Sequence, residues 1–160
     1  MPFSLSHRIA VLTIALMMAG TTAAQAQTSQ LHLGPRLSYQ FDLEDWGVGA
    51  QFSVPIGPYL EFYPSFDIFL VDPGSASNIN VDLKYRIRSQ TAGWLYLGAG
   101  LNLARRGSDD NTDTDAGFNA FIGAESLRGR VHPFGEFRFT ANNGSTGQIS
   151  AGLNFTLGRD

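Results

Sequence analysis

Strict alternation of apolar and polar residues over a ten-residue stretch is the feature that most constrains how this chain can fold. From Ile79 to Arg88 every odd position is apolar and every even position is polar or charged. Because successive side chains of a β-strand point to opposite faces, the pattern predicts a strand with one apolar and one polar face. In a helix the charged residues would be spread around the axis among the apolar ones. The alternation therefore predicts β-structure.

The same pattern recurs along most of the chain after about residue 30 and predicts about eight strands of roughly ten residues. The expected strands are 31–41, 46–56, 59–71, 79–88, 94–104, 115–125, 131–140 and 147–157. Pro64 interrupts the third strand, where we expect a bulge or a missing bond between strands. The first, third, fifth and seventh connections between these strands are mostly longer than the second, fourth and sixth, and residues 105–114 form the longest. An up-and-down barrel with both termini at one end has this pattern.

The N-terminal segment has the order of features of a secretory signal peptide. His7 and Arg8 supply a short positive region, residues 9–19 are apolar except for Thr13, and the small-residue site Ala24–Ala26 follows. The apolar run is shorter than the about 20 residues that a membrane-spanning helix needs. We expect residues 1–26 to be a signal peptide and residues 27–160 to form one β-barrel domain; an uncleaved anchor helix is the alternative.

Composition excludes several classes of function. The chain has no cysteine, which excludes disulfides, thiol catalysis and zinc–thiolate sites. The formal net charge of -3 offers no basic excess for nucleic acid. Charged residues make up 16% of the chain, below the about 25% of an ordinary soluble protein, and Lys84 is the only lysine. We infer that something other than water covers part of the surface.

Two kinds of barrel fit the alternation: a soluble one with an apolar interior, as in lipocalins, or a membrane barrel with an apolar exterior. Glycines gather on the polar face, where inside a narrow barrel they would make room for long side chains. The charges on that face nearly balance, which suits a paired interior. Aromatic residues lie near strand ends, as in a membrane girdle. These residues are Tyr39, Phe41, Trp46, Tyr59, Phe69, Tyr85, Trp94, Phe139 and Phe155.

Energetics decide which face points inward once a membrane is assumed. An arginine or lysine that faces lipid at the bilayer centre costs about 2–4 kcal/mol. Lys84 and Arg86 both facing lipid would remove much of the about 5–15 kcal/mol by which a small domain is stable. The sequence therefore predicts an all-β fold, a closed antiparallel up-and-down transmembrane β-barrel of about eight strands with its polar face inside.

Residues 133–138 (Pro-Phe-Gly-Glu-Phe-Arg) and 151–155 (Ala-Gly-Leu-Asn-Phe) are similar in style to the last two strands of a known group. From Leu31 to Leu157 the chain resembles the small outer-membrane β-barrel proteins of Gram-negative bacteria, the OmpA/OmpX-like group. The resemblance implies a monomer in the cell outer membrane, in contact with outer-membrane lipids and lipopolysaccharide and inserted by the barrel-assembly machinery. Members typically end in an aromatic residue; here Phe155 takes that role or the signal is atypical.

The main candidate site is a network of charged side chains in the lumen. Its expected members are Arg36, Glu61, Asp67, Asp82, Lys84, Arg86, Arg88, Glu125, Glu136 and Arg138. If the strands on either side of residues 72–78 pair as a hairpin, Glu61 lies near Arg86 or Arg88.

The same hairpin would bring Asp67 near Lys84 or Asp82. Buried charges must be paired, and an eight-stranded barrel is just wide enough for side chains to fill. We therefore expect the charged residues to plug the lumen. A gated path for ions or solutes, in which one pair switches partners, is the alternative.

Charged residues also gather in the longest expected external loop. They are Arg105, Arg106, Asp109, Asp110, Asp113 and Asp115. Asp109, Asn111 and Asp113 resemble the start of a calcium loop, but Thr114 stands where such a loop requires glycine. We predict no metal site. A looser divalent site, or arginine contacts to lipopolysaccharide phosphates, are alternatives to a solvated loop.

Signals for catalysis are weak. His32 and His132 are the only histidines after the expected signal peptide, and neither lies in a local catalytic motif. Enzymes of the outer membrane that modify lipid A would need a catalytic group with a positioned partner. We expect a non-enzymatic structural or interaction scaffold with external loops and with no catalytic residue and no cofactor. The alternatives are a narrow-channel porin for ions or small solutes and a soluble, lipocalin-like periplasmic ligand binder.

Overall fold

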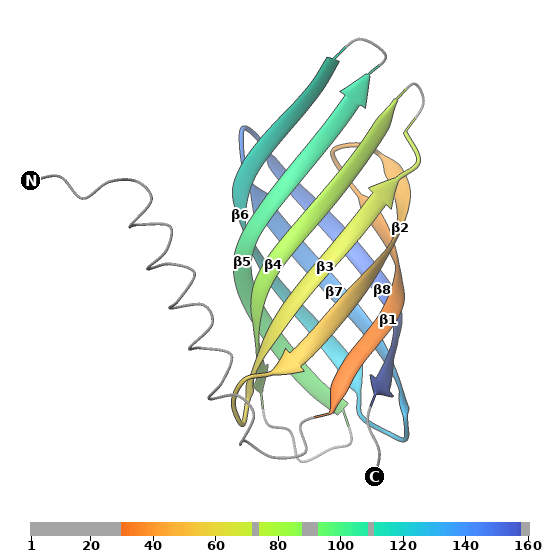
Figure 1. Ribbon diagram of the computed structural model, residues 1–160, viewed down its shortest axis with the longest axis vertical. Coiled ribbons are helices and arrows are strands. Elements are labelled where there is room, and N and C mark those ends of the chain that lie inside the picture. Colours follow the sequence, from red (N-terminus) through yellow and green to blue (C-terminus); the bar gives the residue numbers. More distant parts are fainter. Residues whose placement is uncertain (1–29, 72–73, 88–92, 109–110, 158–160) are drawn as a thin grey trace, which may run out of the picture.

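The computed structural model describes residues 30–71, 74–87, 93–108 and 111–157. The expected signal peptide, Arg88, Asp109 and Asp110 lie outside these residues. The strands are β1 (Leu31–Gln40), β2 (Asp45–Pro55), β3 (Leu60–Phe69), β4 (Ser75–Ile87), β5 (Gly93–Ser108), β6 (Asn111–Ser126), β7 (Val131–Ala141) and β8 (Ser145–Leu157). Each strand pairs antiparallel with its neighbours in chain order, and β8 pairs with β1 (Figure 1). The predicted closed up-and-down barrel is confirmed.

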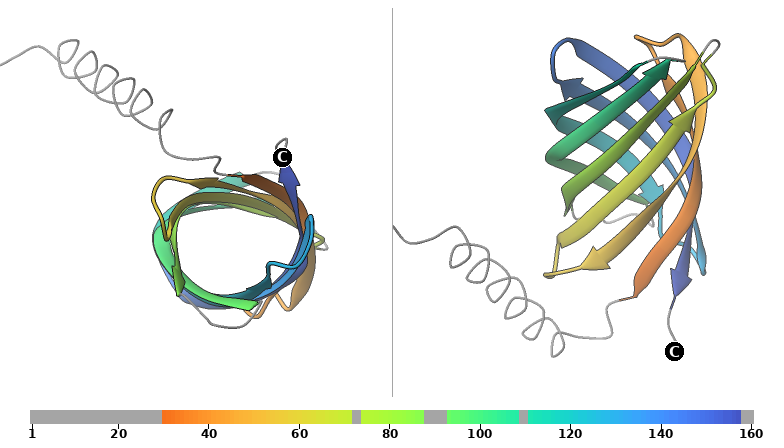
Figure 2. Two further views of the ribbon diagram at one scale, coloured as in Figure 1. Left: turned by 90° about the horizontal axis from the view of Figure 1, so that it is seen from below. Right: turned by 45° about the horizontal axis from the view of Figure 1, so that its top comes forward.

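The strands run obliquely around the barrel axis, and the view along the axis shows a closed ring (Figure 2). We start at Gln40 on β1 and step from each residue to its paired residue on the next strand, first to β8 and then through β7, β6, β5, β4 and β3. This path ends at Pro55 on β2, and the β1–β2 register places Pro55 opposite position 30 of β1. Since the path returns ten residues from its start, the strands tilt by about 40°. A ten-residue strand at that tilt rises about 25 Å, the height of the apolar band of outer-membrane barrels.

The polar positions of the alternating sequence pattern face the lumen of the barrel, and the apolar positions face outward. Lys84 and Arg138 point into the lumen and are each 1% exposed, whereas Leu83 and Leu97 point outward and are 48% and 47% exposed. The same division holds along β1, where the burial pattern alternates from Leu31 to Gln40. This arrangement is the reverse of a soluble protein and of a lipocalin-like interior.

Most of the expected girdle aromatics face outward. We call the end where β1 begins and β8 ends the lower end, and the opposite end the upper end (Figure 1). Near the upper end the Tyr39 ring lies 5.4 Å from that of Phe41 and 5.2 Å from that of Trp46. Phe69 was expected in the girdle, and this was wrong: it is 2% exposed, inside the lumen. Phe69 follows Asp67 by two positions, so the two share the inner face of β3.

The long polar connections are largely strand, which corrects the expected loops. β4 begins at Ser75, within the expected loop 72–78, and the expected loop 105–114 belongs mostly to β5 and β6. The register of these two strands continues to Ser108 opposite Asn111, so they form a hairpin that rises beyond the rest of the upper end (Figure 1). The polar upper parts of β5 and β6 continue the strand pairing that begins in the apolar lower parts of the same strands. The connections at this end are therefore short.

Pro64 leaves a gap in the pairing without a bulge. The β2–β3 pairs stop at Gln51 opposite Ser65 and resume at Val54 opposite Phe62 in an unchanged register. On the other side β3 pairs with β4 without a break. The expected interruption is therefore present as missing pairs on the β2 side.

Glycines on the inner face stand directly opposite inward aromatic residues of the neighbouring strand. The cross-strand pairs are Gly47 with Phe69, Gly98 with Phe121, Gly123 with Tyr96 and Gly152 with Phe134. In each pair the aromatic side chain occupies the space that a glycine Cβ would need. The glycines thus let bulky rings lie across the inner wall of a narrow barrel.

Replacing one of these glycines tests this packing. A Cβ at Gly123 would overlap the Tyr96 ring and the Gly135 carbonyl oxygen, whereas at Gly144 nothing lies within 4 Å. We expect Gly123→Ala to lower the free energy of unfolding by about 1–3 kcal/mol and Gly144→Ala to change it by less than about 0.5 kcal/mol. Urea titration in detergent micelles measures both. Equal stability of the two variants would contradict the packing.

Candidate functional site: the charged lumen

Four charged residues form a cluster in the lower half of the lumen, which we call the lower charge cluster. It consists of Glu61 on β3, Lys84 and Arg86 on β4 and Glu125 on β6. Lys84 Nζ lies 2.8 Å from Glu125 Oε2 and 3.3 Å from Glu61 Oε2. Arg86 Nη2 lies 2.6 Å from Glu61 Oε1, in agreement with the expected neighbourhood. Two cations and two anions balance formally.

Neutral side chains complete the coordination of these carboxylates. Ser53 Oγ donates to Glu61 Oε2 at 2.6 Å, and Asn154 Nδ2 donates to Glu125 Oε1 at 2.8 Å. Gln51 Nε2 in turn donates to Asn154 Oδ1 at 2.6 Å. Hydrogen bonds of this kind stabilise a carboxylate that has lost its water.

Five further charges form the upper charge cluster: Arg36 on β1, Asp67 on β3, Asp82 on β4, and Glu136 and Arg138 on β7. Arg36 lies 3.3 Å from Asp67 and 3.2 Å from Glu136. Arg138 lies 2.7 Å from Asp82 and 3.0 Å from Glu136. Glu136 Oε1 therefore accepts from two guanidinium groups.

The expected position of Asp67 beside Lys84 or Asp82 is wrong. Asp67 lies opposite Asn78 in the β3–β4 register, while Lys84 lies opposite Glu61 near the other end of the strand. Its cation is Arg36, which comes from β1. In a barrel this narrow, partners across the lumen are as close as those on the adjacent strand.

An aromatic layer of Tyr63, Tyr96 and Phe121 lies between the two clusters, and all three side chains are buried. Lys84 Nζ lies 4.9 Å and 4.3 Å from the ring centroids of the two tyrosines. Arg138 Cζ lies 4.5 Å from the centroid of Phe121. These distances are within the range of cation–π attraction, so one cation from each cluster contacts the layer.

Sequence reasoning missed a set of buried amides and hydroxyls in the upper lumen. Asn80 donates to Ser65 Oγ at 3.1 Å, and its Oδ1 accepts from Asn102 at 2.8 Å and from Asn119 at 3.0 Å. Ser38 donates to Asp67 at 2.8 Å. The sequence marks these residues in that they occupy polar positions in the alternating pattern of their strands.

His32 and His132 lie at the lower end of the lumen, with ring centroids 5.2 Å apart. His132 Nδ1 lies 2.8 Å from the Ser126 carbonyl oxygen and Nε2 lies 2.8 Å from Thr156 Oγ1. Within the described part of the chain, no group of three or more His, Asp or Glu is arranged to hold a metal ion. Nor does a helix long and apolar enough to cross a membrane occur in those ranges.

The charged residues expected in one external loop are divided between the two faces of the β5–β6 hairpin. Arg106 points toward the barrel axis and forms an ion pair with Asp42 at 2.5 Å. Asp115 accepts a hydrogen bond from Asn143. Arg105 shares the outer face of β5 with Leu103, which is 42% exposed. Arg105 and Arg106 are adjacent in sequence and therefore point to opposite faces of β5.

This protein is similar to known proteins in its structure, but no match is found from its sequence. No protein-family model matches the sequence, and no curated protein matches it. The N-terminal β-barrel domain of Pseudomonas aeruginosa OprF is 12% identical at a TM-score of 0.70, over 81% of this chain and 98% of that chain. Neisserial surface protein A is 17% identical at 0.64, over 80% and 96%. The attachment invasion locus protein Ail of Yersinia pestis is 14% identical at 0.56, over 81% and 97%. The fold expected from the OmpA/OmpX-like resemblance is confirmed.

Removing the single lysine tests the lower charge cluster. In Lys84→Met the buried carboxylates of Glu61 and Glu125 keep only Arg86, which lies 2.6 Å from Glu61 but 3.8 Å from Glu125. We expect the free energy of unfolding to fall by about 3–5 kcal/mol. Arg106→Gln breaks the pair with Asp42, in which both side chains are about half exposed, and should cost less than about 1 kcal/mol. Urea titration in micelles compares the two. Similar losses would show that the lower pairs are not effectively buried.

Proposed function

We propose that this protein is an integral outer-membrane β-barrel with a structural or interaction role and no enzymatic activity, exported by a signal peptide in residues 1–26. The observation that carries the proposal is the reversed polarity of the barrel. Ionic side chains such as Asp67 and Lys84 are buried in the lumen, while large apolar side chains on the outer face are exposed.

The outer surface supports a lipid environment. Monomeric soluble proteins rarely expose contiguous apolar patches above a few hundred Å². Here large apolar side chains are exposed on the outer face of every strand, from Leu33 on β1 to Leu157 on β8. A soluble, lipocalin-like binder would need the opposite arrangement, with the apolar residues lining a cavity.

The rim of the barrel supports contact with lipopolysaccharide. Arg105 follows Leu103 on the outer face of β5, at the level where the apolar band ends. Guanidinium groups bind phosphates in a bidentate manner, and lipopolysaccharide phosphates would lie at this level. At the lower end Phe155 and Leu157 point outward at the end of β8, which supports Phe155 as the residue read by the barrel-assembly machinery. We propose a monomer.

The contents of the lumen support a plugged scaffold. Ion pairs link distant strands, with Arg36 on β1 joined to Glu136 on β7 and Lys84 on β4 joined to Glu125 on β6. The aromatic layer lies between them, and a barrel of eight strands leaves little space beside its side chains. A narrow channel that opens when one pair exchanges partners is the alternative.

An arginine scan of the outer face of β4 tests the membrane proposal. Leu83→Arg places a charge in the middle of the apolar band and should destabilise the barrel in lipid vesicles by about 2–4 kcal/mol. Ser77→Arg, on the same face above the band, should cost at most about 1 kcal/mol. Equal effects of the two substitutions, or a wild-type protein that stays folded and monomeric without detergent, would refute the proposal.

Planar-bilayer recording tests the plugged lumen. We expect no current above background from the wild type or from Glu136→Ala, because the aromatic layer remains in place when the upper charge cluster loses one carboxylate. A porin of known conductance serves as the positive control. Steady current from the wild type that changes in Glu136→Ala would favour the narrow-channel alternative.

A further inference from the structure

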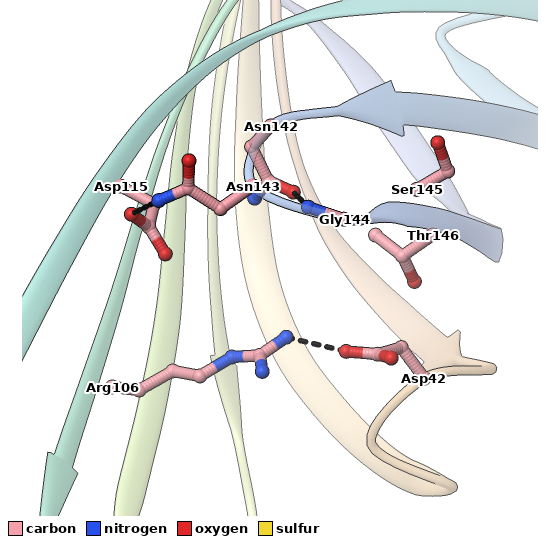
Figure 3. A pocket seen from close by; sticks show the side chains of 8 residues that line it. All are labelled: Asp42, Arg106, Asp115, Asn142, Asn143, Gly144, Ser145 and Thr146. Carbon is pink, nitrogen blue, oxygen red and sulfur yellow. Dashed lines mark hydrogen bonds and ion pairs between the residues drawn. The ribbon is translucent and has the colours of Figure 1, made fainter.

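A cavity of about 200 Å³ opens at the upper end of the barrel, above the lumen network. Asp42 in the β1–β2 turn, Arg106 on β5, Asp115 on β6 and residues 142–146 around the β7–β8 turn line it (Figure 3). Its lining comes from three places that are far apart in the sequence. Neither the charge clusters nor the aromatic layer includes any of these residues.

Contacts within the lining fix its shape. Arg106 Nη2 donates to Asp42 Oδ2 at 2.5 Å, and Asn143 Nδ2 donates to Asp115 Oδ1 (Figure 3). The Gly144 backbone N–H donates to Asn142 Oδ1 at 3.2 Å, which holds the β7–β8 turn. A cavity whose walls are already joined loses little conformational freedom when a ligand binds.

The chemistry of the lining selects the class of ligand. Two carboxylates accept hydrogen bonds, a guanidinium group and two amides donate them, and Ser145 and Thr146 supply hydroxyls that can do both. The formal charge of -1 disfavours phosphates and sulfates, while Arg106 disfavours a metal cation. A neutral ligand rich in hydroxyl groups satisfies donors and acceptors together.

We propose that this cavity binds one residue of a neutral saccharide. A water molecule takes about 30 Å³ in the liquid, so the cavity holds roughly six or seven waters, about the space of a single sugar ring. A longer glycan would extend out of the mouth. That the mouth faces the glycans outside the cell rests on the proposed membrane function, but the binding itself is measurable on the folded barrel in detergent.

Saturation-transfer NMR on the full chain in phosphocholine micelles tests the proposal, with methyl glycosides of neutral hexoses and N-acetylhexosamines as probes. Detergents with sugar headgroups are avoided because they would compete for the site. We expect at least one glycoside to bind with a dissociation constant in the millimolar range. Asp115→Asn and Asn143→Ala should each weaken binding about tenfold or more.

Two matched variants serve as controls. Asp113→Asn makes the same change two positions before Asp115 on β6, and Arg105→Gln changes the arginine next to Arg106 on the other face of β5. Neither residue lines the cavity, so both variants should bind like the wild type. Heat-modifiable gel mobility shows that each variant is folded before binding is measured.

Three results would overturn the proposal. They are no saturation transfer from any glycoside, an equal loss of binding in Asp113→Asn and Asp115→Asn, and calcium-induced shifts at Asp115 and Asn143 without glycoside binding. Failure of the membrane proposal is separate, because it is a failure of the barrel to fold into lipid vesicles, whatever the micelle experiment shows.

Discussion

Pairing of charges across the lumen is the constraint on which this structure depends. Arg36 and Arg138 both bind Glu136, and Lys84 joins Glu61 to Glu125. An unpaired charge in a dry interior costs several kcal/mol, so these side chains must meet. They can meet only if the sheet closes into a narrow ring. Closure also pairs every strand with a neighbour on both sides, apart from local gaps such as the one beside Pro64, so no open sheet edge faces hydrocarbon.

Space inside the ring is the second constraint, and cross-strand glycines meet it. Tyr96 and Phe121 can cross the lumen because Gly123 and Gly98 stand opposite them. The resulting aromatic layer then supplies ring faces to Lys84 and Arg138. Electrostatic and steric requirements are therefore met by one set of inward positions, while the outward positions need only be apolar.

The period-two pattern predicted the strands and which residues face inward, because alternation is a local property of the chain. The expected place of Asp67 beside Lys84 or Asp82 assumed a register of the β3–β4 hairpin that no local pattern fixes. Its actual partner, Arg36, lies on β1, and partners on non-adjacent strands depend on the stagger of the closed barrel. The upper parts of β5 and β6 looked like a loop because strand residues outside the apolar band need no apolar face. Phe69 was wrongly expected in the outer girdle because an aromatic residue near a strand end can pack either against lipid or inside the lumen. For the same reasons the upper cavity, which joins three distant segments, could not be read from the sequence.

The seam between β1 and β8 has a consequence for how such a barrel is built. Ser150 on β8 contacts both Arg36 and Ser38 on β1, and the carboxylate that Arg36 shares with Arg138 lies on β7. The first strand to be synthesised therefore gains part of its polar contacts from the last two strands, and another part from Asp67 on β3. A partly formed sheet without β7 and β8 would leave Arg36 with the Asp67 carboxylate but without Glu136 and Ser150. This incomplete pairing in hydrocarbon favours a single concerted entry over insertion hairpin by hairpin.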